Sequence, residues 1–173
     1  MKFTDIPQIS RATYEVDISW NFLEWWLLDL GDGQIIDYDP DYQRNHVWTE
    51  EQQIAYVEFK LKGGNSSGNL YWNSATYISG GIGDMELVDG KQRLYAVLKF
   101  LRNDLKCLGF YFKEFEDKMR SFGTLQFRMH VNNLKTRKEV LQWYLDLNAG
   151  VAHTDAELNK VRNMLQKCES NKE

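Results

Sequence analysis

The sequence is poor in cysteine and proline and has no long hydrophobic run. Its two cysteines, Cys107 and Cys168, lie far apart, which argues against a disulfide framework or a zinc site. The two prolines, Pro7 and Pro40, exclude a proline-rich linker protein. The most apolar run, residues 20–30, is interrupted by polar side chains and is shorter than the roughly 18 apolar residues of a membrane span. We therefore expect a cytoplasmic chain that has reduced cysteines and no contact with a membrane.

An excess of positive charge is also missing. The 21 Lys and Arg residues are opposed by 25 Asp and Glu residues, so the net charge is −4. This balance argues against a broadly basic nucleic-acid coat, although a local basic patch is compatible with it. Hydrophobic residues make up 43% of the chain, enough for a sizeable core. We expect one domain over residues 1–173.

Five segments have the marks of helices. Capping boxes at 49–52, 136–139 and 154–157 each precede apolar residues at three-to-four spacing, which is the pattern of one helix face. A fourth helix is predicted to begin close to Gly90. A fifth covers residues 19–30, ahead of a glycine-containing turn.

Strands are fewer and shorter. Apolar and polar residues alternate over 125–131, which predicts a half-buried strand. Shorter apolar or aromatic runs predict strands at 34–38, 70–78, 85–88 and 108–112. The order of helices and strands favours an α+β domain with a mixed sheet flanked by helices and a C-terminal helical pair.

The most informative segment is Leu-Val-Asp-Gly-Lys-Gln-Arg-Leu, residues 87–94, where a strand leads through glycine into a helix. Lys91 and Arg93 fall in the first helical turn, where the helix dipole disfavours cations. Two cations there suggest an anionic ligand, for which phosphate is the usual candidate. In the alternative interpretation both cations are solvated and Asp89 caps the helix without a ligand.

A second segment, residues 38–48, reads Tyr-Asp-Pro-Asp-Tyr-Gln-Arg-Asn-His-Val-Trp. Its Arg44 precedes the capped helix and could face the same anion as Arg93. An ion pair of Arg44 with Asp39 or Asp41 is the alternative.

A third segment, residues 145–150, ends in Asn148, Ala149 and Gly150. Asn148 could offer its amide to the site, or could serve as an ordinary residue at a helix C-terminus. The three histidines lack the spacing of a metal site.

The three segments occur together and in order. Tyr-x-Pro-x-Tyr-Gln-Arg with a following Trp, Val-Asp-Gly-Lys-Gln-Arg-Leu, and Leu-Asn-Ala-Gly with a later Glu resemble the ParB-like N-terminal domain of GmrSD-type restriction systems. The family's hallmark is an Asp-Gly-x-Arg-type motif, usually Asp-Gly-Gln-Gln-Arg. The resemblance covers about residues 23–165 and implies a fold related to ParB and sulfiredoxin. Residues 1–18 would then be an N-terminal extension and residues 169–173 a frayed tail.

The resemblance implies a nucleotide pocket around the motif, with NTP binding or hydrolysis tied to action on DNA. Asp89 and Arg93 would form the catalytic pair, and Arg44 would bind phosphates together with Arg93. The other pocket residues that it implies are Gly90, Gln92 and Asn148, and we add Gln43 and Lys91 to the predicted phosphate-binding residues. It leaves open which nucleotide is bound and whether Mg²⁺ is held through Asp89.

Restriction enzymes of this type continue into a His-Asn-His-type nuclease domain, and this sequence has no such motif. We therefore do not expect it to cleave double-stranded DNA alone. The favoured hypothesis is an NTP-hydrolysing domain that acts on or near DNA with a nuclease or restriction subunit, in a defence or phage setting. One alternative is a non-catalytic module or inhibitor that senses nucleotide or binds a protein partner. A ParB-like phosphotransferase is another.

Direct DNA binding rests on few residues. Counterion release requires several clustered cations, and the candidates are Lys135, Arg137 and Lys138. A solvated helix face explains them equally well.

Overall fold

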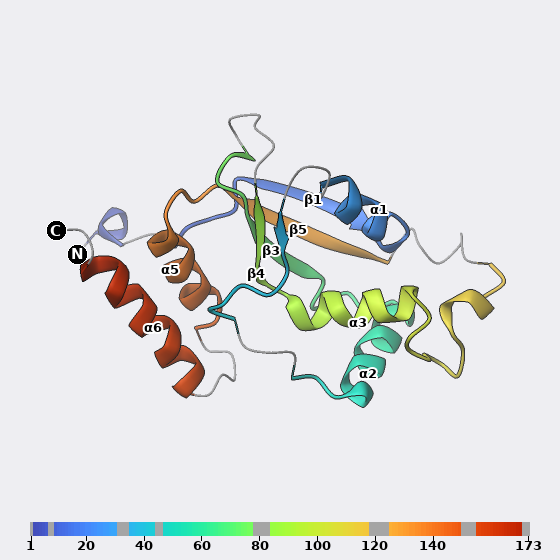
Figure 1. The fold of residues 1–173 in the computed structure, drawn as a ribbon. Helices are drawn as coiled ribbons and strands as arrows, with labels where there is room; N and C mark the ends of the chain where they lie inside the picture. Colours follow the sequence, from blue (N-terminus) through green and yellow to red (C-terminus); the bar gives the residue numbers. More distant parts are fainter. Residues whose placement is uncertain are drawn as a thin grey trace.

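The computed structural model describes residues 2–6, 9–30, 35–43, 47–77, 84–117, 125–149 and 155–170. These ranges contain two 3-10 helices, η1 (Phe3–Asp5) and η3 (Phe112–Glu114), together with five α-helices and five strands. The helices are α1 (Trp20–Leu30), α2 (Glu50–Leu61), α3 (Lys91–Leu101), α5 (Arg137–Leu147) and α6 (Asp155–Ser170). The strands are β1 (Tyr14–Ser19), β2 (Ile36–Asp37), β3 (Asn69–Asn73), β4 (Met85–Asp89) and β5 (Gln126–Asn132). Figure 1 shows their arrangement, with α5 and α6 on one side of the molecule and α2 and α3 on the other.

The strands form one mixed sheet in the order β1-β5-β3-β4-β2. β3 runs parallel to β5 and β2 runs parallel to β4, whereas the β1–β5 and β3–β4 pairs are antiparallel. The predicted α+β class is therefore confirmed, with a mixed sheet and a C-terminal pair of helices, α5 and α6.

The alternating pattern of β5 separates the two faces of the sheet. Phe127, Met129 and Val131 are buried, while Arg128 and His130 lie on the opposite face. The buried side chains pack with α1, α2 and α3 into the main core. The largest fully buried members of this core are Trp20, Trp72, Phe100, Phe127, Leu23, Leu70, Leu87, Leu94, Leu105 and Met129.

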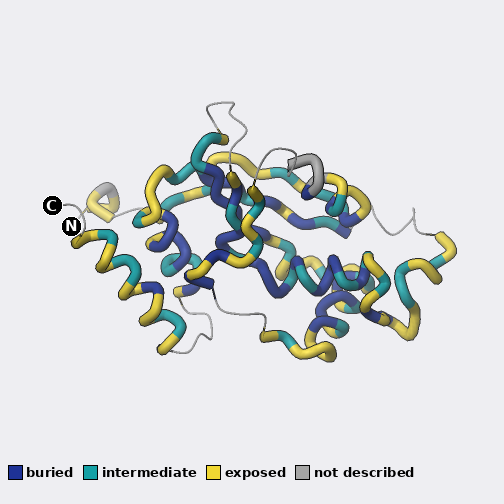
Figure 2. Tube along the Cα trace, in the orientation of Figure 1, coloured by how far each residue is buried: buried dark blue, intermediate teal, exposed yellow. Residues whose placement is uncertain are grey.

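A second, smaller core holds α5 and α6 against the other side of the sheet. Trp143 of α5 meets the ring of Tyr71 of β3 edge-on at 6.1 Å, and Val88 of β4 belongs to the same cluster. Val161 is the buried contact of α6. Figure 2 shows that α3 is buried along most of its length, whereas α6 is exposed on its outer side.

Several predicted boundaries differ from the structure. Residues 14–18, which were expected in an N-terminal extension, and Ser19, which was expected in a helix, form β1, which pairs with β5 along its whole length. The strand predicted at 108–112 is wrong: Leu108 and Gly109 both have positive φ, and they form a turn closed by a bridge between Cys107 and Phe110. The strand predicted at 70–78 ends at Asn73.

The helix starts were predicted more accurately. The capping boxes at Thr49 and Thr136 are both formed. The helix predicted from residue 19 begins at Trp20. Thr154 lies outside the described residues, directly before α6. Within the described ranges, no helix is long and apolar enough to cross a membrane.

We expect Phe127→Ala to destabilise the protein by about 3–5 kcal/mol, because it removes a fully buried ring from the core between the sheet and α1. Phe22→Ala is the matched control, since the Phe22 side chain is 61% exposed, and it should change stability by less than about 0.5 kcal/mol. Denaturant unfolding measures both variants. If both substitutions destabilised the protein equally, the assignment of Phe127 to the buried core and of Phe22 to the exposed surface would be wrong.

Candidate functional site

The turn between β4 and α3 depends on a glycine. Gly90 precedes the first residue of α3 and has a φ of +109°, a left-handed conformation that side chains rarely adopt. A Cβ at this position would lie 2.4 Å from Leu70 Cδ2 and 3.2 Å from the carbonyl oxygen of Asn69. Glycine therefore permits both the turn and the close approach of β3.

This turn brings Arg93 back to Asp89. Arg93 Nη2 donates to Asp89 Oδ2 at 2.8 Å, and the Arg93 side chain is 22% exposed. Its Nε is buried, and no described residue accepts a hydrogen bond from it. The guanidinium is thus fixed in direction while part of its donor capacity is left for a ligand.

The other polar residues of the motif have partners in the preceding loop. The Lys91 side chain is only 5% exposed, and its ammonium forms an ion pair with Asp39. Gln92 Oε1 accepts hydrogen bonds from the backbone of Val47 at 3.1 Å and Trp48 at 3.2 Å. Two carboxylates, Asp39 and Asp89, therefore already balance the cations for which the sequence suggested an anion.

The second segment approaches β4 through Gln43. Its side chain is buried and donates from Nε2 to the carbonyl oxygen of Leu87. Arg44, the phosphate-binding candidate of this segment, lies outside the described residues.

Asn148 lies at the C-terminus of α5 and is buried. Its Nδ2 donates to the carbonyl oxygen of Tyr144 at 2.8 Å, which is the helix-terminal arrangement considered from the sequence. The nearby ring contact between Tyr144 and Tyr42, at 5.1 Å, ties this helix end to the segment that contains Gln43.

Sequence reasoning missed a polar row on the sheet. His130 Nδ1 lies 2.9 Å from Glu15 Oε1, and the imidazole stacks on the Tyr71 ring at 4.7 Å. Asp89 is the register partner of Tyr71 on the next strand. His130 Nε2 is buried without a partner among the described residues. The alternation of Glu15 and Asp17 with apolar residues was the signal that could have revealed this row.

The three residues proposed for DNA binding have partners within the chain. Lys135 donates to the carbonyl oxygen of Ala75, and Lys138 pairs with Glu169 at 2.8 Å. Arg137 pairs with Asp41 and lies over the Tyr42 ring at 4.6 Å. A DNA phosphate would have to compete with these contacts.

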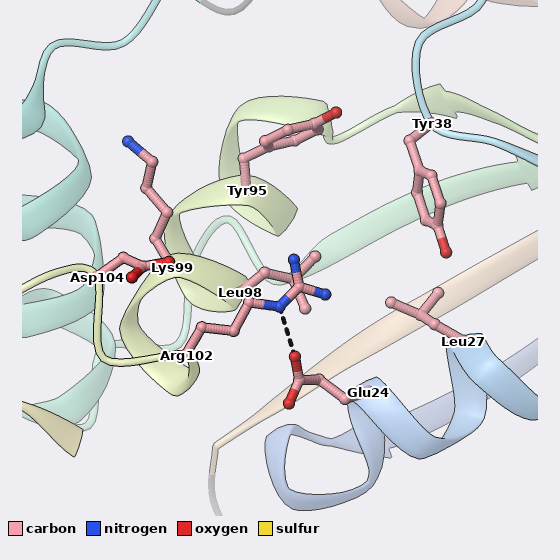
Figure 3. A pocket seen from close by; sticks show the side chains of 8 residues that line it. All are labelled: Glu24, Leu27, Tyr38, Tyr95, Leu98, Lys99, Arg102 and Asp104. Carbon is pink, nitrogen blue, oxygen red and sulfur yellow. Dashed lines mark hydrogen bonds and ion pairs between the residues drawn. The ribbon is translucent and has the colours of Figure 1, made fainter. Parts of the chain in front are cut away.

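A separate hollow of about 320 Å³ lies between α1 and α3. Figure 3 shows Tyr38 and Tyr95 on two of its walls, with the ion pair between Glu24 and Arg102, 2.6 Å long, between the two helices. Its mainly apolar lining and the pairing of Arg102 with Glu24 do not resemble a phosphate site.

The described residues contain no group of three or more His, Cys, Asp or Glu side chains that could hold a metal ion. Any Mg²⁺ at the turn would therefore have to be held largely by a ligand, with Asp89 as the nearby carboxylate.

Comparisons with known proteins identify a family. The family model described as the N-terminal domain of the GmrSD restriction endonuclease matches residues 27–173, a range that contains all three motifs. Searches of curated proteins and of solved structures found no match.

We expect Gly90→Ala to cost about 2–5 kcal/mol, because the left-handed backbone and the contact with Leu70 both oppose a methyl group. Gly109→Ala is the matched control: Gly109 also has a positive φ, but a Cβ there would have nothing within 4 Å. It should lose only about 1–2 kcal/mol. Thermal and denaturant unfolding would compare the two. If both variants lost the same stability, the close contact between residue 90 and Leu70 would contribute nothing to the cost of the substitution.

Proposed function

This chain belongs to the family of GmrSD restriction endonuclease N-terminal domains, and we propose that it binds a nucleoside triphosphate at the turn of residues 89–93. The family connects the chain with restriction or defence. Nucleotide binding, hydrolysis and action near DNA are our finer proposals within that setting.

The observation that carries the proposal is the arrangement of Arg93. Asp89 holds one Nη, the Nε is buried without a described acceptor, and the side chain still reaches solvent. A phosphate could accept from the guanidinium N–H groups that reach solvent, because guanidinium groups favour oxyanions. Gly90 supports this role, because a side chain at its position would crowd Arg93 Nη2, 3.2 Å from the place of its Cβ.

The residues near the turn also suit a metal that arrives with the nucleotide. Mg²⁺ commonly binds through one or two carboxylates, with water and substrate phosphates completing its shell. Asp89 uses Oδ2 for Arg93, which leaves Oδ1 for such an ion. Bound Mg²⁺ would neutralise phosphate charge, while Arg93 would orient the phosphate chain.

Nucleotide binding can be tested by thermal unfolding with ATP, GTP, CTP and UTP, each with and without magnesium. At about 100 times its Kd a ligand stabilises the folded state by about 2.7 kcal/mol, which raises Tm by several degrees. We expect one nucleotide to produce this shift in the wild type and not in Arg93→Ala.

Arg162→Ala is the control, since Arg162 lies on α6 and bonds to Asn159 of the same helix. Each nucleotide is added at a concentration at which the same amount of inorganic phosphate does not change Tm. A full shift in Arg93→Ala, or none with any nucleotide in the wild type, would refute the proposed site.

A second candidate is a nucleotide-sensing module without turnover that binds a protein partner. Phe22 and Trp25, three residues apart on α1, expose large aromatic side chains of the kind found at protein interfaces.

Phosphate release under multiple turnover separates the two candidates. The hydrolysing domain should release phosphate at a rate that falls at least about tenfold in Arg93→Ala, as when one charged group that stabilises a transition state is removed. Wild-type release no faster than that of Arg93→Ala, together with a nucleotide-induced rise in Tm, would select the sensing module.

A further inference from the structure

A polar hollow of about 430 Å³ lies where β3 and β5 begin, beside the end of α2. Its walls include Lys60, two serines of the loop between α2 and β3, and residues from three strands. These strand residues are Asp17 of β1, Asn69 of β3, and Gln126 and Arg128 of β5. The motif at residues 89–93 contributes no lining residue.

Lys60 is the unusual member of this wall. The residue as a whole is 6% exposed, and none of the ion pairs among the described residues includes its ammonium. The Nζ atom lies 3.4 Å from the place that a Cβ on Gly68 would occupy, so it reaches the wall of the hollow. Partial burial disfavours the charged form of the ammonium and lowers the pKa of Lys60.

The other charges of the hollow cancel each other. Arg128 donates to Asp17 through two parallel bonds, Nε to Oδ1 at 2.9 Å and Nη2 to Oδ2 at 3.0 Å. The ammonium of Lys60 is therefore the uncompensated charge among the described lining residues. Such a site selects an anion over a cation.

Hydrogen-bond donors accompany this charge. Ser66 and Ser67, which carry hydroxyl groups, line the hollow, and Tyr56 Oη donates to the carbonyl oxygen of Ser67 at 2.8 Å. The backbone N–H of Arg128 donates to the carbonyl oxygen of Gly68 at 2.9 Å. The loop is thus anchored from α2 and from β5, which holds the two serines beside the hollow.

We propose that this hollow is a second anion site, which binds a phosphate group through the Lys60 ammonium and the hydroxyls of Ser66 and Ser67. A fixed ammonium with several neutral donors suits an oxyanion that offers three or more oxygens. The volume exceeds that of a phosphate group, so the natural ligand is a larger phosphorylated molecule, either a nucleotide or a nucleic-acid 5′ end. The site does not depend on nucleotide binding at Arg93.

The test is the Tm of the full chain in increasing inorganic phosphate, against sodium chloride at equal ionic strength. We expect the wild type to gain several degrees once phosphate exceeds its Kd about a hundredfold. Lys60→Met keeps an unbranched side chain of similar length without the charge. The Lys60→Met variant should have a higher Tm than the wild type in sodium chloride, because it no longer buries a charged side chain. Added phosphate should not raise its Tm further.

Lys62→Met is the matched control, because Lys62 lies two residues further along, is exposed and pairs with Glu58. It should keep the full response to phosphate. A rise in Tm that Arg93→Ala keeps and Lys60→Met loses separates this site from the proposed nucleotide site. Should Lys60→Met fail to fold, Lys60→Gln provides the same comparison. No rise in the wild type beyond the chloride control, or an undiminished rise in a folded Lys60 variant, would overturn the proposal.

The source of the phosphate group follows from two further probes. A nucleoside monophosphate represents a free nucleotide, and a short oligonucleotide with and without a 5′-phosphate represents a nucleic-acid end. A Lys60-dependent shift with the monophosphate, or with the phosphorylated oligonucleotide alone, supports the site and identifies its ligand. Equal shifts with both forms of the oligonucleotide in wild type and Lys60→Met would contradict it.

Discussion

The left-handed backbone at Gly90 is the constraint on which the arrangement of the candidate site depends. It lets β4 pass directly into α3 while the turn lies against Leu70 and the backbone of Asn69. Because the helix begins at once, Arg93 lies one turn from Asp89 and pairs with it. The same turn directs Lys91 and Gln92 to the loop before α2, where they bind Asp39 and the backbone of residues 47–48. One glycine thus positions the arginine and ties two loops together.

The sheet supports this turn by keeping its two faces different. One face carries apolar side chains and packs with three helices, while the other carries Glu15, His130 and Tyr71 in register. α5 covers part of that second face through Trp143. The α6 helix adds a single fully buried side chain, Val161, to that cover. Asp89 lies beside this polar row at the end of β4, because it is the register partner of Tyr71.

The sequence predicted the structural features that depend on residues close together in the chain. The capping boxes at Thr49 and Thr136 need only residues three apart, and the alternation of β5 needs only its own residues. The β1 strand was missed because its apolar side alternates over only two positions, Val16 and Ile18, and its pairing partner lies more than a hundred residues away. The family motif predicted the turn between β4 and α3 and the glycine in it, Gly90. It did not show that Lys91 would be buried against Asp39, because that contact spans 52 residues.

Charge pairing explains why Lys60 differs from the other cations. In a chain of net charge −4, carboxylates are available for most cations. Lys91, Arg93, Arg128 and Arg137 each pair with an aspartate from a nearby turn or strand. Lys60 is among the most buried cations described, yet its neighbours in the hollow are hydroxyls, amides and an ion pair that is already complete. Desolvation without a partner opposes the charged form of Lys60, and an anion bound in the hollow would relieve that cost.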